Sequence, residues 1–332
     1  MKRTGGLLER ILEWDNLLLA YQRARLGLAC KEPAERYSRA LDHQLSALRE
    51  GLANGSFDFG KYHSFVVRDP KRRLIHAPGF PARVAHHAIF NICEPFFDGR
   101  LVSATYACRK GFGTHGAISR AAGLSRKYAW HLQMDVRKFF DSIPHSELLT
   151  VLGRVFKERE LMVLFRSILG GYHSVQGVDR GLPIGSLASQ HFANLYLGSL
   201  DRLVIEVCRI RGYVRYMDDF VLWANTPDEL LAAREKILCH LDCLGLRLKR
   251  KSTPQPSCHG LGFLGHRIYP HRIILARRSR TRYVRKARIY GKQFAKGEID
   301  ELKLQAGLDA LSGFGKLARM GHLNVSLLQE GL

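Results

Sequence analysis

The spacing of hydrophobic residues changes along the chain and predicts alternating blocks of helix and strand. Apolar side chains recur at intervals of three and four residues within 7–55, which is typical of amphipathic helices. Residues 62–68 and 73–76 are short apolar runs joined by Asp69-Pro70-Lys71-Arg72, and they predict a strand pair. Further helices are predicted at 80–97, 143–170, from the loop 181–186 to Val207 and at 228–243, and further strands at 130–136, near 245–250 and at 261–268.

Residues 211–225, RGYVRYMDDFVLWAN, predict a hydrophobic hairpin with two adjacent aspartates at its tip. Two-residue hairpin turns require positive φ and favour Asn-Gly or Asp-Gly, yet this turn contains no glycine. Asp218 and Asp219 repel one another and have low strand propensity, so they give the hairpin no local benefit. Clustered carboxylates are stabilised by a hard divalent cation with oxygen ligands. The pair therefore predicts a metal-binding functional site.

Asp135 ends the predicted strand WHLQMDV (130–136) and is the candidate for a third carboxylate. Two Mg²⁺ ions about 3.5–4 Å apart can stabilise the attacking and leaving oxygens of a phosphoryl transfer. Such an arrangement calls for a third carboxylate, which a neighbouring strand could deliver. Taken alone, an Asp at a strand end is more often a turn or capping residue.

The charge of the chain points to a polyanionic partner. It contains 52 Lys and Arg against 30 Asp and Glu, which gives a formal net charge of +22 and a pI near 10.0. A surplus of this size predicts nucleic-acid binding, with a solvated basic surface as the alternative. Nine Lys or Arg lie within 277–296, where Tyr283, Ala287, Tyr290 and Phe294 form an apolar seam at helical spacing. We expect this helix to contact a nucleic-acid backbone through Arg278, Arg282, Arg285 and Lys286.

Composition excludes several other classes of protein. Hydrophobic residues make up 46% and charged residues 25%, which argues against disorder. No apolar run approaches the ~18–20 residues of a membrane span, and the first residues lack a signal-peptide core. The seven cysteines fit reduced thiols, and the spacing of Cys239, Cys243 and Cys258 disfavours a zinc site. We therefore expect a cytoplasmic protein with no membrane partner.

Three segments occur in an order that resembles the core motifs of reverse transcriptases: QMDVRKFFDSIPH (133–145), GLPIGSLASQHFANLYLGSLD (181–201) and YMDDF (216–220). Residues 62–115 resemble the upstream finger motifs of that family, and GLGFLGHRI (260–268) resembles its primer grip. The resemblance implies an α+β, right-hand polymerase fold. Its expected parts are N-terminal helices and fingers at 1–130, an antiparallel-sheet palm at 131–270 and a helical basic thumb at 271–332.

The resemblance also implies a catalytic site for RNA-directed DNA synthesis. Asp135, Asp218 and Asp219 match the catalytic metal-binding aspartates, and the carbonyl of Val136 matches a further ligand. The implied cofactor is a pair of Mg²⁺ ions, with Mn²⁺ as an alternative. The implied substrates are dNTPs, an RNA template and a DNA primer duplex.

Further residues match the positions that bind the incoming nucleotide and the primer. Phe140 matches an aromatic gate that would collide with a 2′-OH, whereas Phe139 is expected in the core. Arg73, assisted by Lys71, matches the arginine that neutralises the triphosphate. Lys249 is placed to donate a proton to the leaving pyrophosphate. The expected primer-grip residues are Phe263, Leu264 and Gly265.

The loop at 182–190 departs from the usual family pattern, L-P-Q-G-x-x-x-S-P. Ile184 stands in place of Gln, and Gln190 stands in place of Pro. This variant is typical of the enzymes of diversity-generating retroelements, which resemble group II intron enzymes. A Gln could hydrogen-bond near the nascent base pair, whereas Ile offers only packing, so we expect lower fidelity. The resemblance implies that the errors concentrate opposite template adenines. Members of that group copy a structured template RNA and work with a small basic pentameric accessory protein.

Other features of the chain narrow the class of enzyme. Ala82 and His86 replace an Asp and a Gln that the family often has, which puts the template contacts of that helix in question. A Val-Thr-Gly is absent from the thumb region, which disfavours a retron enzyme, and no maturase, RNase H or endonuclease domain is expected after it. The implied source is bacterial, archaeal or phage. The alternatives are an antiphage-defence or other group II-like reverse transcriptase, and a non-enzymatic nucleic-acid binder.

Overall fold

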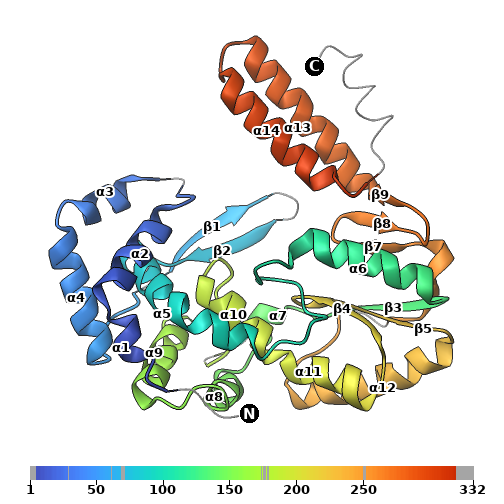
Figure 1. Ribbon diagram of the computed structural model, residues 1–332, viewed down its shortest axis with the longest axis horizontal. Helices are drawn as coiled ribbons and strands as arrows, with labels where there is room; N and C mark the ends of the chain where they lie inside the picture. The colour runs from blue at the N-terminus through green and yellow to red at the C-terminus, as the bar shows by residue number, and fades with distance from the viewer. Residues whose placement is uncertain are drawn as a thin grey trace. The chain divides into compact units, whose positions relative to one another are not determined.

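The computed structural model describes residues 5–28, 30–60, 62–68, 72–172, 174, 177, 179–249 and 252–318 (Figure 1). The chain forms two compact units, and neither is a continuous segment. The first unit comprises 1–103, 135–203 and 237–250, and the second comprises 104–134, 204–236 and 251–332. No helix of the described residues is long and apolar enough to cross a membrane.

The first unit is built around the long helix α5 (Phe80–Asp98). Helices α1 (Leu8–Ile11), α2 (Trp14–Arg25), α3 (Glu32–Ser38) and α4 (Leu41–Ala53) all pack against it (Figure 1). Its residues Val84, Ala85, Ala88 and Ile89 have no exposed surface, because small and branched side chains at helical spacing let these neighbours approach closely.

An aromatic core joins α5 to two further helices of this unit, α9 (Arg159–Gly170) and α10 (Leu187–Tyr196). The other helices of the unit are α7 (Phe139–Ser142), α8 (His145–Gly153) and α11 (Gly198–Arg202). Phe97 of α5, Phe165 of α9 and Phe192 of α10 meet with ring centroids 5.3–6.3 Å apart. Edge-to-face contacts of this kind add to the hydrophobic stabilisation of a core.

The first unit also contains a two-stranded antiparallel sheet. Strand β1 (His63–Val67) pairs with β2 (Arg73–Ala77) from His63↔Ala77 to Val67↔Arg73. Every residue of β1 is exposed, and Phe65 is 50% exposed. The hairpin therefore gains little from burial.

The second unit contains a four-stranded sheet in the order β4-β5-β3-β6. Strands β4 (Gly212–Tyr216) and β5 (Asp219–Ala224) form an antiparallel hairpin, and β3 (Trp130–Asp135) pairs with β6 (Gln255–Pro256). Helix α6 (Gly113–Lys127) packs on β4, and its residues Ile118 and Ala121 share one core with Val214, Val221 and Trp223. A π-helical turn (Leu203–Val207) precedes β4. Helix α12 (Pro227–Cys243) follows β5.

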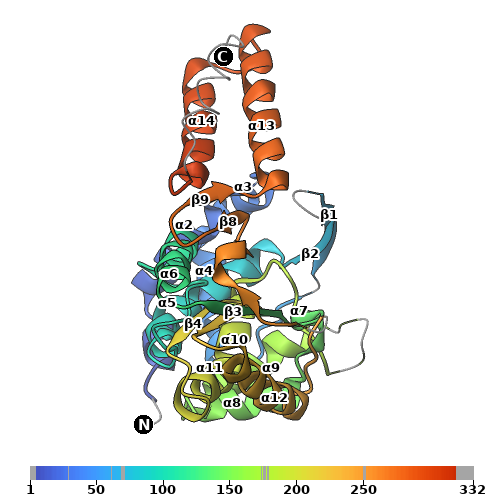
Figure 2. The same ribbon diagram turned by 90° about the vertical axis from the view of Figure 1, so that its right-hand side faces the viewer.

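A three-stranded sheet and two long helices complete the second unit. The sheet contains β7 (Leu261–Phe263), β8 (His266–Ile268) and β9 (Ile273–Leu275), preceded by a 3₁₀ turn (Ser257–His259). Helices α13 (Arg277–Ala295) and α14 (Glu301–Gly315) lie side by side (Figure 2). Tyr283 and Ala287 are buried between them, against Leu308, Leu311 and Phe314, as the apolar seam in the sequence predicts. Phe294, the last residue of the predicted seam, is instead 44% exposed.

Three predicted elements differ from the structure. The predicted helix 143–170 is interrupted between α8 and α9. The predicted strand 261–268 is a hairpin, because Leu264 and Gly265 both adopt positive φ. The predicted strand near 245–250 is only an isolated bridge, Val136↔Leu248, among the described residues. Strand β3 ends at Asp135, so this segment has no longer strand to pair with.

Candidate active site

The acidic turn connects two strands that are almost completely buried. Tyr216 pairs with Asp219, so the turn residues are Met217 and Asp218, and Asp219 is the first residue of β5. The prediction that both aspartates form the tip is therefore one residue out of register. Met217 adopts φ 56°, an uncommon conformation for a residue other than glycine. Backbone conformations of this kind persist where the surrounding structure holds them, often at functional sites.

Arg215 supports this turn from below and was not singled out from the sequence. Its side chain is fully buried, and its guanidinium donates to the carbonyl of Met217 at 3.2 Å and to Thr105 Oγ1 at 3.4 Å. A buried cation is tolerated only with such partners. The sequence did contain a signal for this residue, because Arg215 is a charged residue within an otherwise apolar predicted strand.

Strand β3 lies next to β5 in the sheet and contributes to the surroundings of Asp219. Gln133 Nε2 donates to Asp219 Oδ1 at 2.9 Å. Asp135 follows two residues later, so it lies on the same face of β3 as Gln133. The sheet thus carries Asp135 at the end of one strand and Asp219 at the start of the next.

Asp135 is paired with Lys249, the predicted proton donor. Lys249 Nζ lies 2.9 Å from Asp135 Oδ2, and the backbone N–H of Lys249 donates to the carbonyl of Asp135 at 2.9 Å. The side chain of Asp135 is 37% exposed and that of Lys249 is 55% exposed, so the ion pair contributes at most about 1 kcal/mol to the stability of the fold. Asp135 and Lys249 can therefore each leave this weak ion pair and bind another charged partner.

The chemistry of these groups suits a hard divalent cation. Carboxylate oxygens and a backbone carbonyl, such as that of Val136, are the ligands that Mg²⁺ prefers. Among the described residues, no three His, Cys, Asp or Glu side chains converge into a metal cluster. The oxygen ligands are therefore of the type that Mg²⁺ prefers, but among the described residues the side chains do not converge on a single metal position.

Phe140 lies beside the loop that contains Ile184. Phe139 is 2% exposed and belongs to the core, whereas Phe140 is half-buried with its ring 5.6 Å from that of Phe139. The N–H of Leu182 donates to the carbonyl of Phe140 at 2.8 Å. The predicted gate and the variant loop are therefore joined by the backbone.

Ile184 is clamped against strand β2. The N–H of His76 donates to the carbonyl of Ile184 at 2.7 Å. Gly185 adopts φ 118°, and a Cβ there would lie 2.6 Å from Cγ2 of Ile75. Glycine is required at this position, both for its conformation and for the close approach of β2. Gln190 lies on α10 and is exposed.

A group of polar and aromatic side chains near this loop was largely missed by sequence reasoning. Burial, with a smaller contribution from His87, lowers the pKa of His86 to about 3, so His86 is neutral at physiological pH. Its Nδ1 lies 3.4 Å from Ser186 Oγ, and its ring stacks on Phe59 at 5.4 Å. His76 contacts Tyr172 at 4.9 Å between ring centroids. Only His86 had been noted, as a departure from the family pattern.

Arg73 and Lys71 flank the turn of the β1–β2 hairpin in the sequence. Arg73 is the first residue of β2, pairs with Val67 and is exposed. Lys71 lies outside the described residues. The structure therefore leaves the side chain of Arg73 available to solvent, and its predicted contact with a triphosphate stays a prediction.

The predicted primer grip is a tight hairpin between β7 and β8. Phe263 is 1% exposed and belongs to the core, and Leu264 and Gly265 form the turn with φ 47° and 81°. A Cβ on Gly265 would lie 2.9 Å from Ser279 Oγ and 3.1 Å from the ring of Phe314. Phe263 therefore supports the hairpin from within the core.

The four basic residues selected on α13 differ in their surroundings. Arg278 and Arg285 are exposed, whereas Arg282 and Lys286 are half-buried, and the guanidinium of Arg282 lies 5.7 Å from the ring centroid of Phe314 on α14. A hollow of about 700 Å³ follows another face of α13 and includes Arg285. Its other basic residues, which also belong to the nine Lys and Arg of 277–296, are Arg277, Arg280, Arg288 and Lys292.

Comparison with known proteins now identifies the family. A sequence model described as reverse transcriptase (RNA-dependent DNA polymerase) matches residues 68–268, which include the acidic turn, Asp135 and the loop of Ile184. The chain belongs to the reverse transcriptase family. This match covers strand β2, strands β3, β4 and β5, and the β7–β8 hairpin, and it confirms the family that the motifs resemble.

Individual relatives of this reverse transcriptase agree. Protein YkfC of Escherichia coli is 26% identical over 286 residues, which cover 72% of this chain and 73% of YkfC. The group II intron-encoded protein LtrA of Lactococcus lactis is 24% identical over 144 residues, which cover 41% of this chain and 24% of LtrA. Against most of the curated relatives that it matches, this chain spans about a quarter of their length or less.

A solved structure extends the agreement to the fold. The structure of apo telomerase from Candida tropicalis, truncated from its C-terminal domain, matches with a TM-score of 0.50 and 12% identity. The match covers 66% of this chain and 55% of the telomerase chain. Together with the mixture of helices and antiparallel sheets, it confirms the expected α+β polymerase fold.

Proposed function

We propose that this reverse transcriptase synthesises DNA on an RNA template by extending a primer with dNTPs. The observation that carries the proposal is the acidic turn. Asp218 follows a strained Met217, Asp219 is held by Gln133 of β3, and β3 ends in Asp135. A fold that only bound nucleic acid would gain nothing from this concentration of carboxylates on buried strands.

The carboxylates of Asp135, Asp218 and Asp219 and the carbonyl of Val136 would hold two Mg²⁺ ions, or Mn²⁺ in their place. Bound ions of this kind supply charge stabilisation to the attacking and leaving oxygens of nucleotidyl transfer. Lys249 would then exchange its exposed ion pair with Asp135 for the pyrophosphate, to which it donates a proton. Its position beside Asp135 supports this role.

Other residues would select and orient the substrates. Arg73, with Lys71, would neutralise the triphosphate, and the half-buried ring of Phe140 would exclude a 2′-OH. The primer would lie along the Phe263–Gly265 hairpin. The basic face of α13, including Arg278, Arg282, Arg285 and Lys286, would contact template–primer phosphates, so binding should weaken as salt rises.

Within this function, we place the chain among the enzymes of diversity-generating retroelements. Ile184 and Gln190 support this assignment. The N–H of His76 holds the backbone of Ile184 through its carbonyl, and the aliphatic side chain of Ile184 offers no hydrogen bond. A site without polar groups discriminates poorly between bases, because a mismatch leaves nothing polar unpaired.

This assignment carries further expectations. The template would be a structured RNA, the partner a small basic pentameric accessory protein, and the compartment the cytoplasm. An antiphage-defence or other group II-like reverse transcriptase is the second candidate, favoured by the similarity to LtrA. Near-identical template and variable repeats beside the gene would support the first, and a defence island would support the second.

Primer extension on a defined RNA, followed by sequencing of the products, tests both levels of the proposal. We expect DNA products that depend on the RNA and carry errors concentrated opposite adenines. Ile184→Gln should lower the adenine error rate, while Leu187→Gln, a change on the same segment at the start of α10, serves as the matched control. An absence of products would overturn the polymerase assignment, and an unchanged adenine error rate in Ile184→Gln would overturn the role of Ile184.

A further inference from the structure

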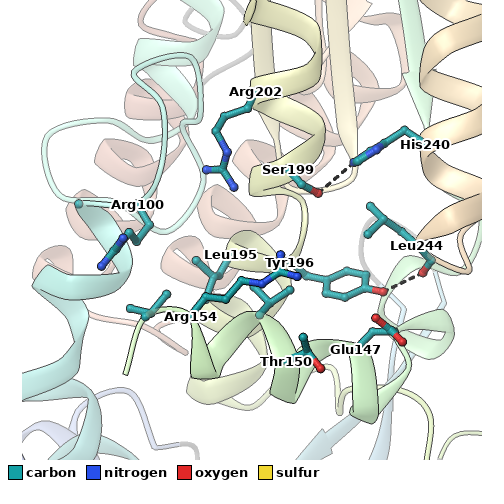
Figure 3. A pocket seen from close by; sticks show the side chains of 13 residues that line it. Arg100, Glu147, Thr150, Arg154, Leu195, Tyr196, Ser199, Arg202, His240 and Leu244 are labelled. Atoms are coloured by element: carbon teal, nitrogen blue, oxygen red, sulfur yellow. Dashed lines mark hydrogen bonds between the residues drawn. The ribbon is translucent and has the colours of Figure 1, made fainter. Parts of the chain in front are cut away.

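The first unit contains a cavity of about 460 Å³ that includes none of the predicted catalytic or substrate-binding residues (Figure 3). Its walls come from the ends of α5, α8 and α11, from α10 and from the last turn of α12. Val151, Val155 and Leu195 form an apolar floor. This volume falls within the range of about 300–1,000 Å³ that small-ligand sites occupy.

Three arginines from separate elements surround the apolar floor. Arg100 follows α5, Arg154 caps the C-terminus of α8, and Arg202 ends α11, and Figure 3 shows all three around the same hollow. Arg154 and Arg202 are exposed. A cation at the C-terminus of a helix is favoured by itself. That preference explains each arginine separately, but it does not explain why three of them meet around one apolar surface.

Apart from Glu147, the remaining polar groups of the cavity carry no charge. Tyr196 Oη donates to the carbonyl of Leu244 at 2.7 Å, which holds the ring in place. Ser199 Oγ lies 3.0 Å from His240 Nε2, and burial lowers the pKa of His240, so it carries no charge at neutral pH. Glu147 is the one acidic side chain in the lining, against three arginines. The cavity is therefore cationic at its rim and apolar at its base.

We infer that this cavity binds single-stranded RNA, with one unstacked base on the apolar floor and adjacent phosphates on Arg154 and Arg202. The cavity suits a nucleotide, which combines a flat base whose faces pack on apolar side chains with phosphate charges on either side. Proteins recognise single-stranded RNA in this manner, by packing splayed bases and by pairing arginines with the backbone. An acidic peptide would match the charge but would leave the enclosed apolar floor without a counterpart.

The choice of RNA rests on the proposed copying of RNA templates, whereas the cavity itself would be a second point of contact with such an RNA. It would hold a single-stranded part of the template molecule while another part is copied. The +22 charge of the chain is consistent with more than one RNA-binding surface.

Binding of a fluorescein-labelled oligouridine to the full chain tests the inference by anisotropy. The cavity variant is Arg154→Glu/Arg202→Glu. The control is Arg159→Glu/Arg166→Glu, which makes the same change of charge on exposed residues of α9 in the same unit. We expect the cavity variant to bind about tenfold more weakly than the control. The slope of the logarithm of its RNA-binding constant against the logarithm of the salt concentration should be shallower than that of the control by about 1.4, the value for two phosphate contacts on a single strand.

A second variant tests the apolar floor without changing charge. Val151→Trp fills the hollow, and Val163→Trp places the same ring on the exposed surface of α9. We expect Val151→Trp, but not Val163→Trp, to reduce ultraviolet crosslinking of 4-thiouridine RNA to peptides from 150–155 and 195–202.

Two results would overturn the inference. One is equal RNA affinity of the cavity and control variants, with no crosslinks to these peptides. The other is binding of a Glu-rich peptide that the cavity substitutions abolish while RNA binding stays equal to the control. Primer extension by the unmodified protein is measured in parallel. Its failure would overturn the proposed polymerase, while the comparison of affinities would still decide the cavity.

Discussion

Two hairpins of this protein use strand residues in opposite ways. The β4–β5 hairpin buries nearly all of both strands and ends in an acidic turn, whereas β1–β2 exposes every residue of β1 and has Arg72 and Arg73 beside its turn. The first is held by a packed core and the second mainly by strand pairing and by the bond from His76 to Ile184. We infer that β4–β5 is a rigid support that keeps the carboxylates fixed. We infer that β1–β2 is a lightly anchored support that lets its basic residues move toward an incoming nucleotide.

The largest effect on folding should come from removing the support of the acidic turn. Trp223→Ala deletes a buried ring on β5 and leaves Ser125 Oγ without the 3.1 Å hydrogen bond that Trp223 Nε1 donates. We expect a loss of about 3–5 kcal/mol in the free energy of unfolding. Denaturant unfolding measures this, and a loss below about 1 kcal/mol would show that the hairpin does not depend on its core.

Gly185→Ala should have the next largest effect, because it separates the variant loop from β2. The added Cβ would lie 2.6 Å from Ile75 Cγ2 and would impose φ 118° on an alanine. We expect destabilisation by about 1–3 kcal/mol and a changed error spectrum. Gly123→Ala, on α6 with no atom within 4 Å of the new Cβ, is the control. It should leave the error spectrum unchanged and should not destabilise the protein, because Ala is favoured over Gly by about 0.5–1 kcal/mol within a helix.

The buried His86 near this loop should make stability depend on pH. Its folded pKa of about 3 lies below the ordinary value of 6.5, so the unfolded chain binds more protons between these values. Its contribution is complete above pH 6.5 and is lost as pH falls, with a slope of up to about 1.4 kcal/mol per pH unit. His86→Gln should flatten the wild-type slope between pH 4 and 6.5, and an identical slope in the two proteins would contradict the assignment.

The smallest effect should come from the exposed face of β1. Phe65 is 50% exposed, so Phe65→Ser removes little buried surface. We expect a change within about 0.5 kcal/mol in the free energy of unfolding. A loss as large as that of Trp223→Ala would mean that a partner surface covers β1 and that the contrast between the hairpins is not real.

The buried hairpin could be predicted from sequence, and its exact register could not. Runs of Tyr, Val, Phe, Leu and Trp made β4 and β5 evident, and the adjacent aspartates indicated a metal site. The turn is set by the positive φ of Met217, which depends on Arg215 and the surrounding core. Non-glycine residues adopt that conformation too rarely for a sequence rule to place it.

Residues that depend on packing between elements were also beyond the sequence. A basic helix was predicted correctly at 277–295, but the direction of Arg282 toward Phe314 depends on how α14 packs. The order β4-β5-β3-β6 places Gln133 beside Asp219, and strand order cannot be read from hydrophobic spacing alone. The arginines of the cavity lie far apart in the chain, 54 residues from Arg100 to Arg154 and 48 residues from Arg154 to Arg202, so no local pattern joins them.

The central claim is that the acidic turn exists for catalysis, and single-nucleotide incorporation on an RNA template tests it most directly. Asp219→Asn keeps an oxygen for the hydrogen bond from Gln133 and removes only the charge. We predict a rate at least about a thousandfold lower, with unchanged or slightly higher stability because the repulsion from Asp218 is gone. Asp242→Asn, an exposed residue on α12, should incorporate nucleotides at the parental rate. Incorporation by Asp219→Asn at the rate of that control would contradict the account.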